Sequence, residues 1–130
     1  MQRHILVIDD EQSVRDAFAL ALESEGYEVD TAADGEEGLR KFSVNPPDLV
    51  FLDLRMPGMG GIETLRRLKG LSPNSPVYIV TAFYQAYLEP LQALQEEGVT
   101  FQLAKKPLGA HDIREITRSV FEGPEAVFHE

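Results

Sequence analysis

The segment Ile5-Leu6-Val7-Ile8-Asp9-Asp10-Glu11 decides the fold of this chain of 130 residues. Its four consecutive apolar residues are too few for a helix and show no alternation of apolar and polar side chains. Such a run is typical of a parallel strand that is covered on both faces. Three acidic residues follow it directly, so the segment predicts a cluster of carboxylates at the end of a buried strand.

Four further runs rich in strand-forming apolar residues follow along the chain, so the five predicted strands are residues 5–8, 29–32, 49–52, 77–80 and 100–104. Stretches with helical spacing of apolar residues alternate with them, at about residues 13–25, 36–42, 62–69, 88–97 and 111–122. Most of these stretches stop at a glycine, namely Gly26, Gly70, Gly98 or Gly123. Strands that alternate with helices predict one α/β domain with an open parallel sheet and right-handed crossovers.

Composition excludes several classes of protein. With 12 basic and 22 acidic residues the net charge is −10, which argues against a general nucleic-acid binder and against docking on anionic lipid. The longest apolar runs are too short for a membrane span or the core of a signal peptide. The absence of cysteine excludes disulfides, thiolate zinc sites and thiol nucleophiles, and it favours a cytoplasmic protein.

Polar side chains follow four of the five predicted strands. They are Asp9, Asp10 and Glu11 after the first strand, Asp53 after the third, Thr81 after the fourth, and Lys105 and Lys106 after the fifth. Each of them taken alone is most often a helix cap, a turn residue or a solvated surface group. Because ligands of open α/β sheets bind outside the carboxyl ends of the strands, their joint occurrence there predicts a functional site.

Crowded carboxylates at this edge call for a cation. Two carboxylates about 4 Å apart repel by about 4 kcal/mol at an effective dielectric constant of 20. Either their pKa values rise or a positive charge compensates them. A site of oxygen ligands with open positions is what Mg²⁺ prefers, because this ion keeps several waters and uses one or two carboxylates together with a phosphate.

The motifs together resemble a response-regulator receiver domain, over residues 3–122. Four of them appear in order: the segment quoted above, Asp53-Leu54-Arg55-Met56-Pro57-Gly58-Met59-Gly60-Gly61, Thr81-Ala82, and Lys106-Pro107. The separations of 43 positions from Asp10 to Asp53 and of 28 from Asp53 to Thr81 are ordinary for such domains. We therefore expect a receiver domain at residues 1–122 and a C-terminal tail at residues 123–130.

The resemblance implies a doubly wound (βα)5 domain whose five-stranded parallel sheet has the order 2-1-3-4-5, with helices on both faces. It implies that Asp53 accepts a phosphoryl group from the phosphohistidine of a sensor histidine kinase or a histidine phosphotransfer protein. Mg²⁺ would be held by Asp9, Asp10, Asp53 and the main-chain carbonyl of Arg55. Thr81 would hydrogen-bond a phosphoryl oxygen, and a lysine would neutralise charge on the transferring group.

The function implied is signalling rather than turnover of an external substrate. The protein would catalyse only its own phosphorylation and dephosphorylation, within a two-component phosphorelay, and phosphorylation would switch a protein-interaction surface. The sequence names neither the cognate kinase nor the downstream effector, and homodimer formation on phosphorylation is one form that the response can take. No direct contact with nucleic acid or membrane is expected.

The lysine of the site is assigned to Lys106 rather than Lys105. Adjacent strand residues point to opposite faces, so both side chains cannot enter one pocket while the strand stays regular. In receiver-like domains the functional lysine directly precedes a proline whose peptide bond is cis, which here is Pro107. Counting from Gly98 with the usual family spacing lands on Lys105 instead, so this assignment places an extra residue at about 99–101.

Three features depart from the family pattern. The 25 positions from Thr81 to Lys106 exceed the usual interval, and the segment holds the aromatic residues Phe83, Tyr84 and Tyr87, which serve either as packing or as a partner surface. The position three before the lysine, often aromatic in the family, is Leu103, or Gln102 in the other register. Gly60 stands where many members have Asp, Ser or Asn, which weakens a helix cap without touching the chemistry.

The same residues fit other classes of protein less well. A metal-dependent phosphatase with an aspartate nucleophile would need Asp-x-Asp after the first strand, and the chain has Asp9-Asp10-Glu11 there. The Gly-x-Ser-x-Gly motif of serine hydrolases and the glycine-rich phosphate loops are absent. The alternative that remains is a phosphorylation-independent protein-interaction module of the same fold. A reaction with acetyl phosphate separates the two.

Overall fold

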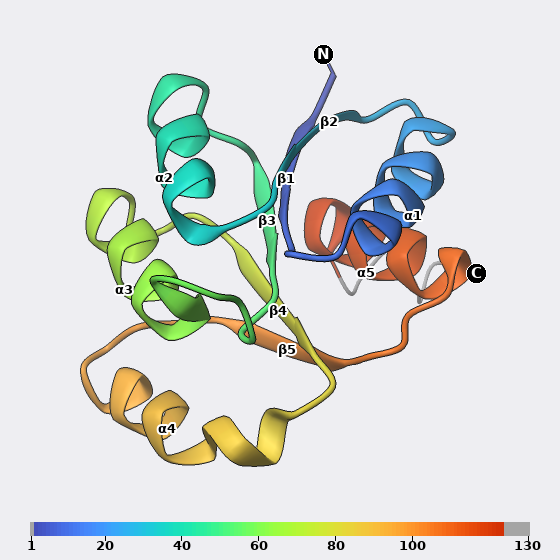
Figure 1. The fold of residues 1–130 in the computed structure, drawn as a ribbon. Helices are drawn as coiled ribbons and strands as arrows, with labels where there is room; N and C mark the ends of the chain where they lie inside the picture. The colour runs from blue at the N-terminus through green and yellow to red at the C-terminus, as the bar shows by residue number, and fades with distance from the viewer. Residues whose placement is uncertain (1, 124–130) are drawn as a thin grey trace.

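Five parallel strands form the centre of the computed structural model, in which residues 2–123 are described (Figure 1). The strands are β1 (His4–Ile8), β2 (Glu28–Ala32), β3 (Leu49–Leu52), β4 (Val77–Thr81) and β5 (Gln102–Lys105). They pair in the order β2-β1-β3-β4-β5, so the predicted sheet order is confirmed. The predicted tail falls on residues 123–130, of which 124–130 lie outside the described residues.

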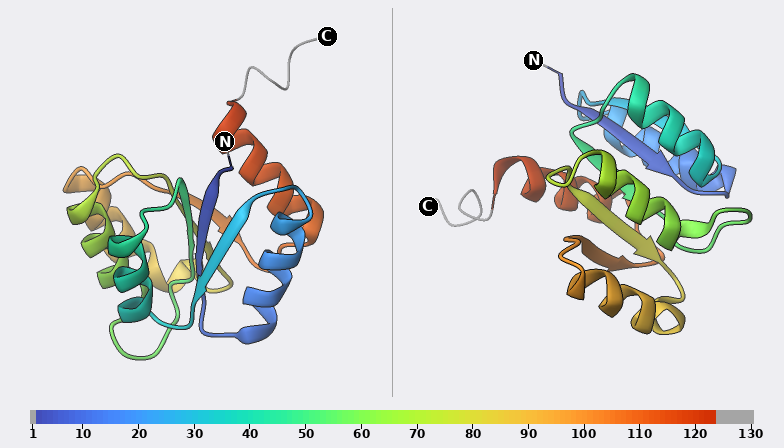
Figure 2. Two further views of the ribbon diagram at one scale, coloured as in Figure 1. Left: turned by 90° about the horizontal axis from the view of Figure 1, so that it is seen from above. Right: turned by 90° about the vertical axis from the view of Figure 1, so that its left-hand side faces the viewer.

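Helices cover both faces of the sheet, as predicted. They are α1 (Gln12–Glu23), α2 (Gly35–Val44), α3 (Gly60–Leu71), α4 (Leu88–Glu96) and α5 (Ala110–Glu122), with a 3-10 turn η1 (Tyr84–Tyr87) before α4. Figure 2 shows α1 and α5 on one face and α2, α3 and α4 on the other. None of the helices formed by residues 2–123 is long and apolar enough to cross a membrane.

The continuous apolar run of β1 is explained by burial on both sides. Ile5 and Val7 pack with α1 and α5, whereas Leu6 and Ile8 pack with α2, α3 and α4. All four side chains are at most 1% exposed, and full burial of such a side chain contributes about 1.5–3 kcal/mol. The strand is therefore the shared wall of two cores, and its end is a firm base for the acidic residues that follow.

Several predicted boundaries were wrong by one or two residues, and two of these differences are informative. Strand β5 begins at Gln102 rather than residue 100, since the hydroxyl of Thr100 accepts a hydrogen bond from Nζ of Lys69 (3.2 Å) in the preceding loop. Helix α3 runs through Gly70, the predicted stop, and ends at Leu71. Its C-cap, Ser72, precedes Pro73 and is extended (φ −151°, ψ 90°), as the residue before a proline usually is.

The beginning of α3 lies directly against the end of β3. A Cβ atom on Gly61 would stand 2.3 Å from Cα of Leu54 and 2.6 Å from the carbonyl oxygen of Asp53. The amide of Gly61 also donates a hydrogen bond to the carbonyl of Leu54 (2.9 Å). Only a glycine fits here, so this contact fixes the backbone that carries Asp53.

Two alanine substitutions on α3 test this contact. Gly61→Ala forces backbone atoms apart and should lower the free energy of unfolding by about 2 kcal/mol or more. Gly70→Ala, on the same helix with no atom within 4 Å of the added Cβ, should raise it by up to about 1 kcal/mol. Urea unfolding of both variants gives the comparison, and an equal effect of the two would contradict the assigned role of Gly61.

Candidate functional site

Three aspartates meet where β1 and β3 end. Ile8 pairs with Leu52 in the sheet, so Asp9 and Asp53 follow neighbouring residues, and the amide of Asp53 donates to the carbonyl of Ile8 (2.9 Å). Asp9 and Asp53 are buried (4% and 5% exposed), whereas Asp10 is exposed. One carboxylate oxygen from each of the three lies within 4.8 Å of the others.

Lys106 reaches the same cluster from the end of β5. Its Nζ lies 2.8 Å from Oδ2 of Asp9, 3.6 Å from Oδ2 of Asp53 and 3.8 Å from Oε1 of Glu11. Its amide donates to the carbonyl of Thr81 (3.0 Å), and the bond to the following proline is cis. The structure thus brings this lysine, rather than its neighbour, into the cluster.

Lys105 lies outside the cluster. It pairs with Thr81 in the sheet, and its Nζ lies 4.3 Å from the centroid of the Tyr84 ring. The two adjacent lysines therefore have different surroundings: Lys105, the last residue of β5, contacts Tyr84, and Lys106, directly after the strand, contacts the carboxylates.

The cluster contains more acidic than basic side chains. Burial, followed by the charge of the Asp9 carboxylate, raises the pKa of Asp53 from 3.8 to about 6, although Lys106 opposes both effects. Burial tends to lower the pKa of Lys106, but its hydrogen bond to Asp9 and the charge of Asp53 outweigh this, so the pKa is raised. One ammonium group does not offset the acidic groups around it.

This imbalance and the donor set fit a hard divalent cation. All candidate ligand atoms are oxygens, and the exposed Asp10 leaves the cluster open on one side. Mg²⁺ favours such a set because it binds few carboxylates and keeps open positions for water or phosphate. The residues present therefore fit the ion that the sequence implied.

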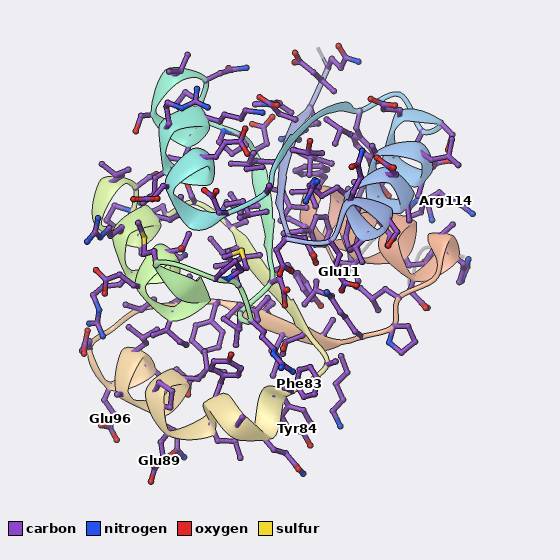
Figure 3. The ribbon with its side chains drawn as sticks, in the orientation of Figure 1. Glu11, Phe83, Tyr84, Glu89, Glu96 and Arg114 are labelled. Carbon is purple, nitrogen blue, oxygen red and sulfur yellow. The ribbon has the colours of Figure 1, made fainter. Side chains whose placement is uncertain are left out.

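A cavity of about 250 Å³ opens above the cluster, lined by Asp10, Glu11, Asp53, Arg55, Phe83 and Lys106. Figure 3 labels Glu11 and Phe83, which come from the segments after β1 and β4 at this edge. Thr81 is fully buried at the end of β4, where its Oγ1 accepts a hydrogen bond from the amide of Phe83 (3.2 Å). Its hydroxyl is thereby coupled to the loop that borders the cavity.

Glu11 acts through its backbone rather than its side chain. Its amide donates to Oδ1 of Asp9 (2.9 Å), which orients that carboxylate. Glu11 is also the N-cap residue of α1, and its side chain makes no capping hydrogen bond. It therefore starts the helix, as the sequence indicated, and its carboxylate stays exposed at the rim.

Sequence reasoning missed two arginine contacts. The guanidinium of Arg15 donates to the main-chain carbonyl of Asp9 (2.6 Å), and that of Arg55 stacks on the ring of Phe83, 4.5 Å from its centroid. Neither pairing has a local signal in the sequence. Arg15 is a polar residue of a predicted helix, and Arg55 was expected to contribute only its main-chain carbonyl to the site. The unusual aromatic segment after Thr81 was the one available indication for the second contact.

The family of the chain follows from this geometry together with a match to known proteins. A family model described as the response regulator receiver domain matches residues 5–118. The chain belongs to this family. Receiver domains are signalling phosphoacceptors of two-component systems, so the fold and the acidic pocket described above are those of a signal-transduction domain.

Relatives of this receiver domain include single-domain and longer regulators. Sporulation initiation phosphotransferase F of Bacillus subtilis is 36% identical over 118 residues, which cover 91% of this chain and 93% of the relative. The alkaline phosphatase synthesis transcriptional regulatory protein PhoP of the same species is 42% identical over 82 residues. That match covers 63% of this chain and 34% of PhoP, so the chain spans about a third of that relative.

Solved structures show the same fold. The chemotaxis protein CheY4 of Vibrio cholerae superimposes with a TM-score of 0.81 at 29% identity, covering 92% of this chain and 99% of CheY4. NtrX of Brucella abortus gives a TM-score of 0.80 at 29% identity, covering 98% of this chain and 28% of NtrX.

The raised pKa of Asp53 predicts a dependence of stability on pH in the absence of divalent cations. Between about pH 4 and pH 6 the folded protein binds more protons at this carboxyl than the unfolded chain does. The contribution of Asp53 to the free energy of unfolding is therefore most favourable below this range and is lost as pH rises through it. Asp53→Asn should therefore raise the free energy of unfolding at pH 8 by about 1–3 kcal/mol, and by less near pH 4.

The measurement is urea unfolding in EDTA at several pH values. Asp16→Asn, on the exposed side of α1, is the matched control, and its effect should not change over the same range. An effect of Asp53→Asn that is equal at pH 4 and pH 8 would contradict the assigned electrostatics.

Proposed function

We propose that this protein is the phosphoacceptor of a two-component phosphorelay and that Asp53 receives the phosphoryl group. The observation that carries the proposal is a nearly buried carboxylate, Asp53, whose Oδ2 lies 3.6 Å from Nζ of Lys106 in an oxygen-rich pocket. The donor is a phosphohistidine of a sensor histidine kinase or a histidine phosphotransfer protein. A relative of nearly the same length that is named a phosphotransferase supports this choice.

Each residue of the pocket has a definite task in the transfer. A carboxylate oxygen of Asp53 attacks phosphorus, the bond from phosphorus to the donor atom breaks, and the donor leaves with that electron pair. Lys106 offsets negative charge on the transferring oxygens, because its ammonium group already touches both buried carboxylates. Thr81 supplies a hydroxyl hydrogen bond to a phosphoryl oxygen.

Asp9 and Asp10, with Asp53 and the main-chain carbonyl of Arg55, would hold Mg²⁺. When bound, the ion supplies neutralisation of charge on the phosphoryl group. Asp9 is oriented for this by the amide of Glu11 and Asp10 is exposed to solvent, so a buried and an open ligand stand side by side.

The response to phosphorylation is proposed to be a change in a protein-interaction surface that includes α4, β5 and α5. Thr81 ends the strand that leads into η1 and α4, and Lys106 ends β5. A new charge on Asp53 pulls on both residues and hence on both segments. The partner that reads this surface is a downstream effector protein or domain.

Incubation with acetyl phosphate and Mg²⁺ tests the phosphoacceptor. Intact-mass spectrometry should show one added HPO₃ on the wild type and on Asp16→Asn, and none on Asp53→Asn, because Asp53, unlike the equally buried Asp9, lines the cavity beside Lys106. EDTA should abolish the adduct. An equal adduct on Asp53→Asn would overturn the assignment, and no adduct on the wild type would favour the phosphorylation-independent module.

The two adjacent lysines provide a second test. Lys106→Ala should slow phosphorylation by about a hundredfold, since it removes the positive charge nearest the transferring group. Lys105→Ala should leave the rate unchanged, because its ammonium group lies on Tyr84 outside the pocket. The initial rate of adduct formation measures both effects, with circular dichroism to confirm folding. A large loss confined to Lys105→Ala would reverse the choice.

A further inference from the structure

Arg55 and Phe83 meet at the rim of the cavity above Asp53. The guanidinium carbon of Arg55 lies 4.5 Å from the centroid of the Phe83 ring. Both residues line the cavity of about 250 Å³ that Asp53 also lines, and Phe83 is 49% exposed. The pair therefore faces the space that a phosphoryl group on Asp53 would occupy.

The guanidinium of Arg55 is not engaged with the acidic groups around it. Within residues 2–123, the ion pairs formed by the acidic residues of this cavity all end on Lys106. The cationic group of Arg55 rests on an aromatic face instead. A cation–π contact at an exposed site is weak compared with a charge-assisted, two-pronged contact from arginine to phosphate.

We propose that Arg55 is a phosphoryl-binding residue of this site. Phe83 binds the guanidinium of Arg55 as long as Asp53 carries no phosphoryl group. The inference rests on the function proposed above. When Asp53 carries a phosphoryl group, the guanidinium leaves the Phe83 ring and donates hydrogen bonds to phosphoryl oxygens. Lys106 is a compact charge tied to Asp9, whereas Arg55 adds a planar fork of donors from the opposite segment.

Phe83 then weakens the binding of the phosphoryl group, because its ring and the phosphoryl oxygens compete for the same guanidinium. Removing Arg55 should weaken the binding of a phosphoryl mimic, and removing Phe83 should strengthen it. The effect of Phe83 should vanish once Arg55 is gone. This dependence distinguishes competition from a purely structural role of the ring.

Beryllofluoride, which mimics a phosphoryl group on aspartate, is the probe. Its half-saturating concentration is measured in the presence of Mg²⁺ by amide chemical shifts. Arg55→Ala should raise that concentration roughly tenfold, and Phe83→Ala should lower it about two- to fivefold. The double variant should match Arg55→Ala, and Arg55→Lys should fall between Arg55→Ala and the wild type because it keeps the charge but not the fork.

Tyr84→Ala is the matched control, since it removes the neighbouring cation–π contact with Lys105 and should change nothing. Mg²⁺ affinity without beryllofluoride is measured for every variant, so that an effect on the metal is separated from an effect on the anion. Unchanged beryllofluoride binding in Arg55→Ala, or a Phe83→Ala effect that persists in the double variant, overturns the inference. If the wild type takes a phosphoryl group from acetyl phosphate, such a result removes only the role of Arg55. If the wild type takes none and binds no beryllofluoride, the proposed function falls as well.

Discussion

The burial of two neighbouring carboxylates beside a single ammonium group is the constraint on which the rest of this structure depends. Asp9 and Asp53 lie where β1 and β3 end, and their amides donate hydrogen bonds to the carbonyls of Ala32 and Ile8, which hold both main chains in the sheet. Lys106 contacts both, yet the pKa of Asp53 is still raised to about 6. The folded chain therefore maintains a local excess of negative charge that it cannot relieve by itself.

Close packing around the sheet keeps this unfavourable arrangement in place. A Cβ atom on Gly38 would stand 2.5 Å from Cδ1 of Ile8, and one on Gly35 would stand 2.0 Å from Oγ1 of Thr64. Helix α2 is thus seated against β1 and α3 without room for adjustment, and Gly61 does the same for α3 against the end of β3. Because the strand ends cannot move apart, repulsion among the carboxylates is relieved either by protonation or by a bound cation.

The sequence predicted what local patterns determine and missed what distant contacts determine. The run from Ile5 to Ile8 and the acidic residues after it located the first strand and the site, since burial on two faces leaves a continuous apolar pattern. The sheet order came only with the family resemblance, because five similar strands carry no signal of their neighbours. The start of β5 was misplaced because Thr100 is held by Lys69, a residue 31 positions away whose burial has no local signature.

The site was predictable to a similar degree. Alternation along a strand was enough to separate Lys105 from Lys106, but the partner of each required the three-dimensional structure. The stacking of Arg55 on Phe83 joins two loops that follow different strands, and neither sequence segment indicates the other.

The two aromatic residues after β4, Phe83 and Tyr84, each contact a cationic side chain from a neighbouring strand end. The ring of Phe83 contacts the guanidinium of Arg55, and the ring of Tyr84 contacts the ammonium group of Lys105, so consecutive aromatic residues contact one cation from the loop after β3 and one from the end of β5. The amide of Phe83 also donates to the hydroxyl of Thr81. Cation–π contacts respond to the electrostatic potential around the cation, and Arg55 lines the same cavity as Asp53. Leu103 occupies the position where an aromatic side chain is common in this family, whereas Phe83, which directly precedes η1, lines the cavity beside Asp53. If Arg55 has the role proposed above, a change of charge at Asp53 acts on this segment at Phe83, which is joined both to Arg55 and to the hydroxyl of Thr81.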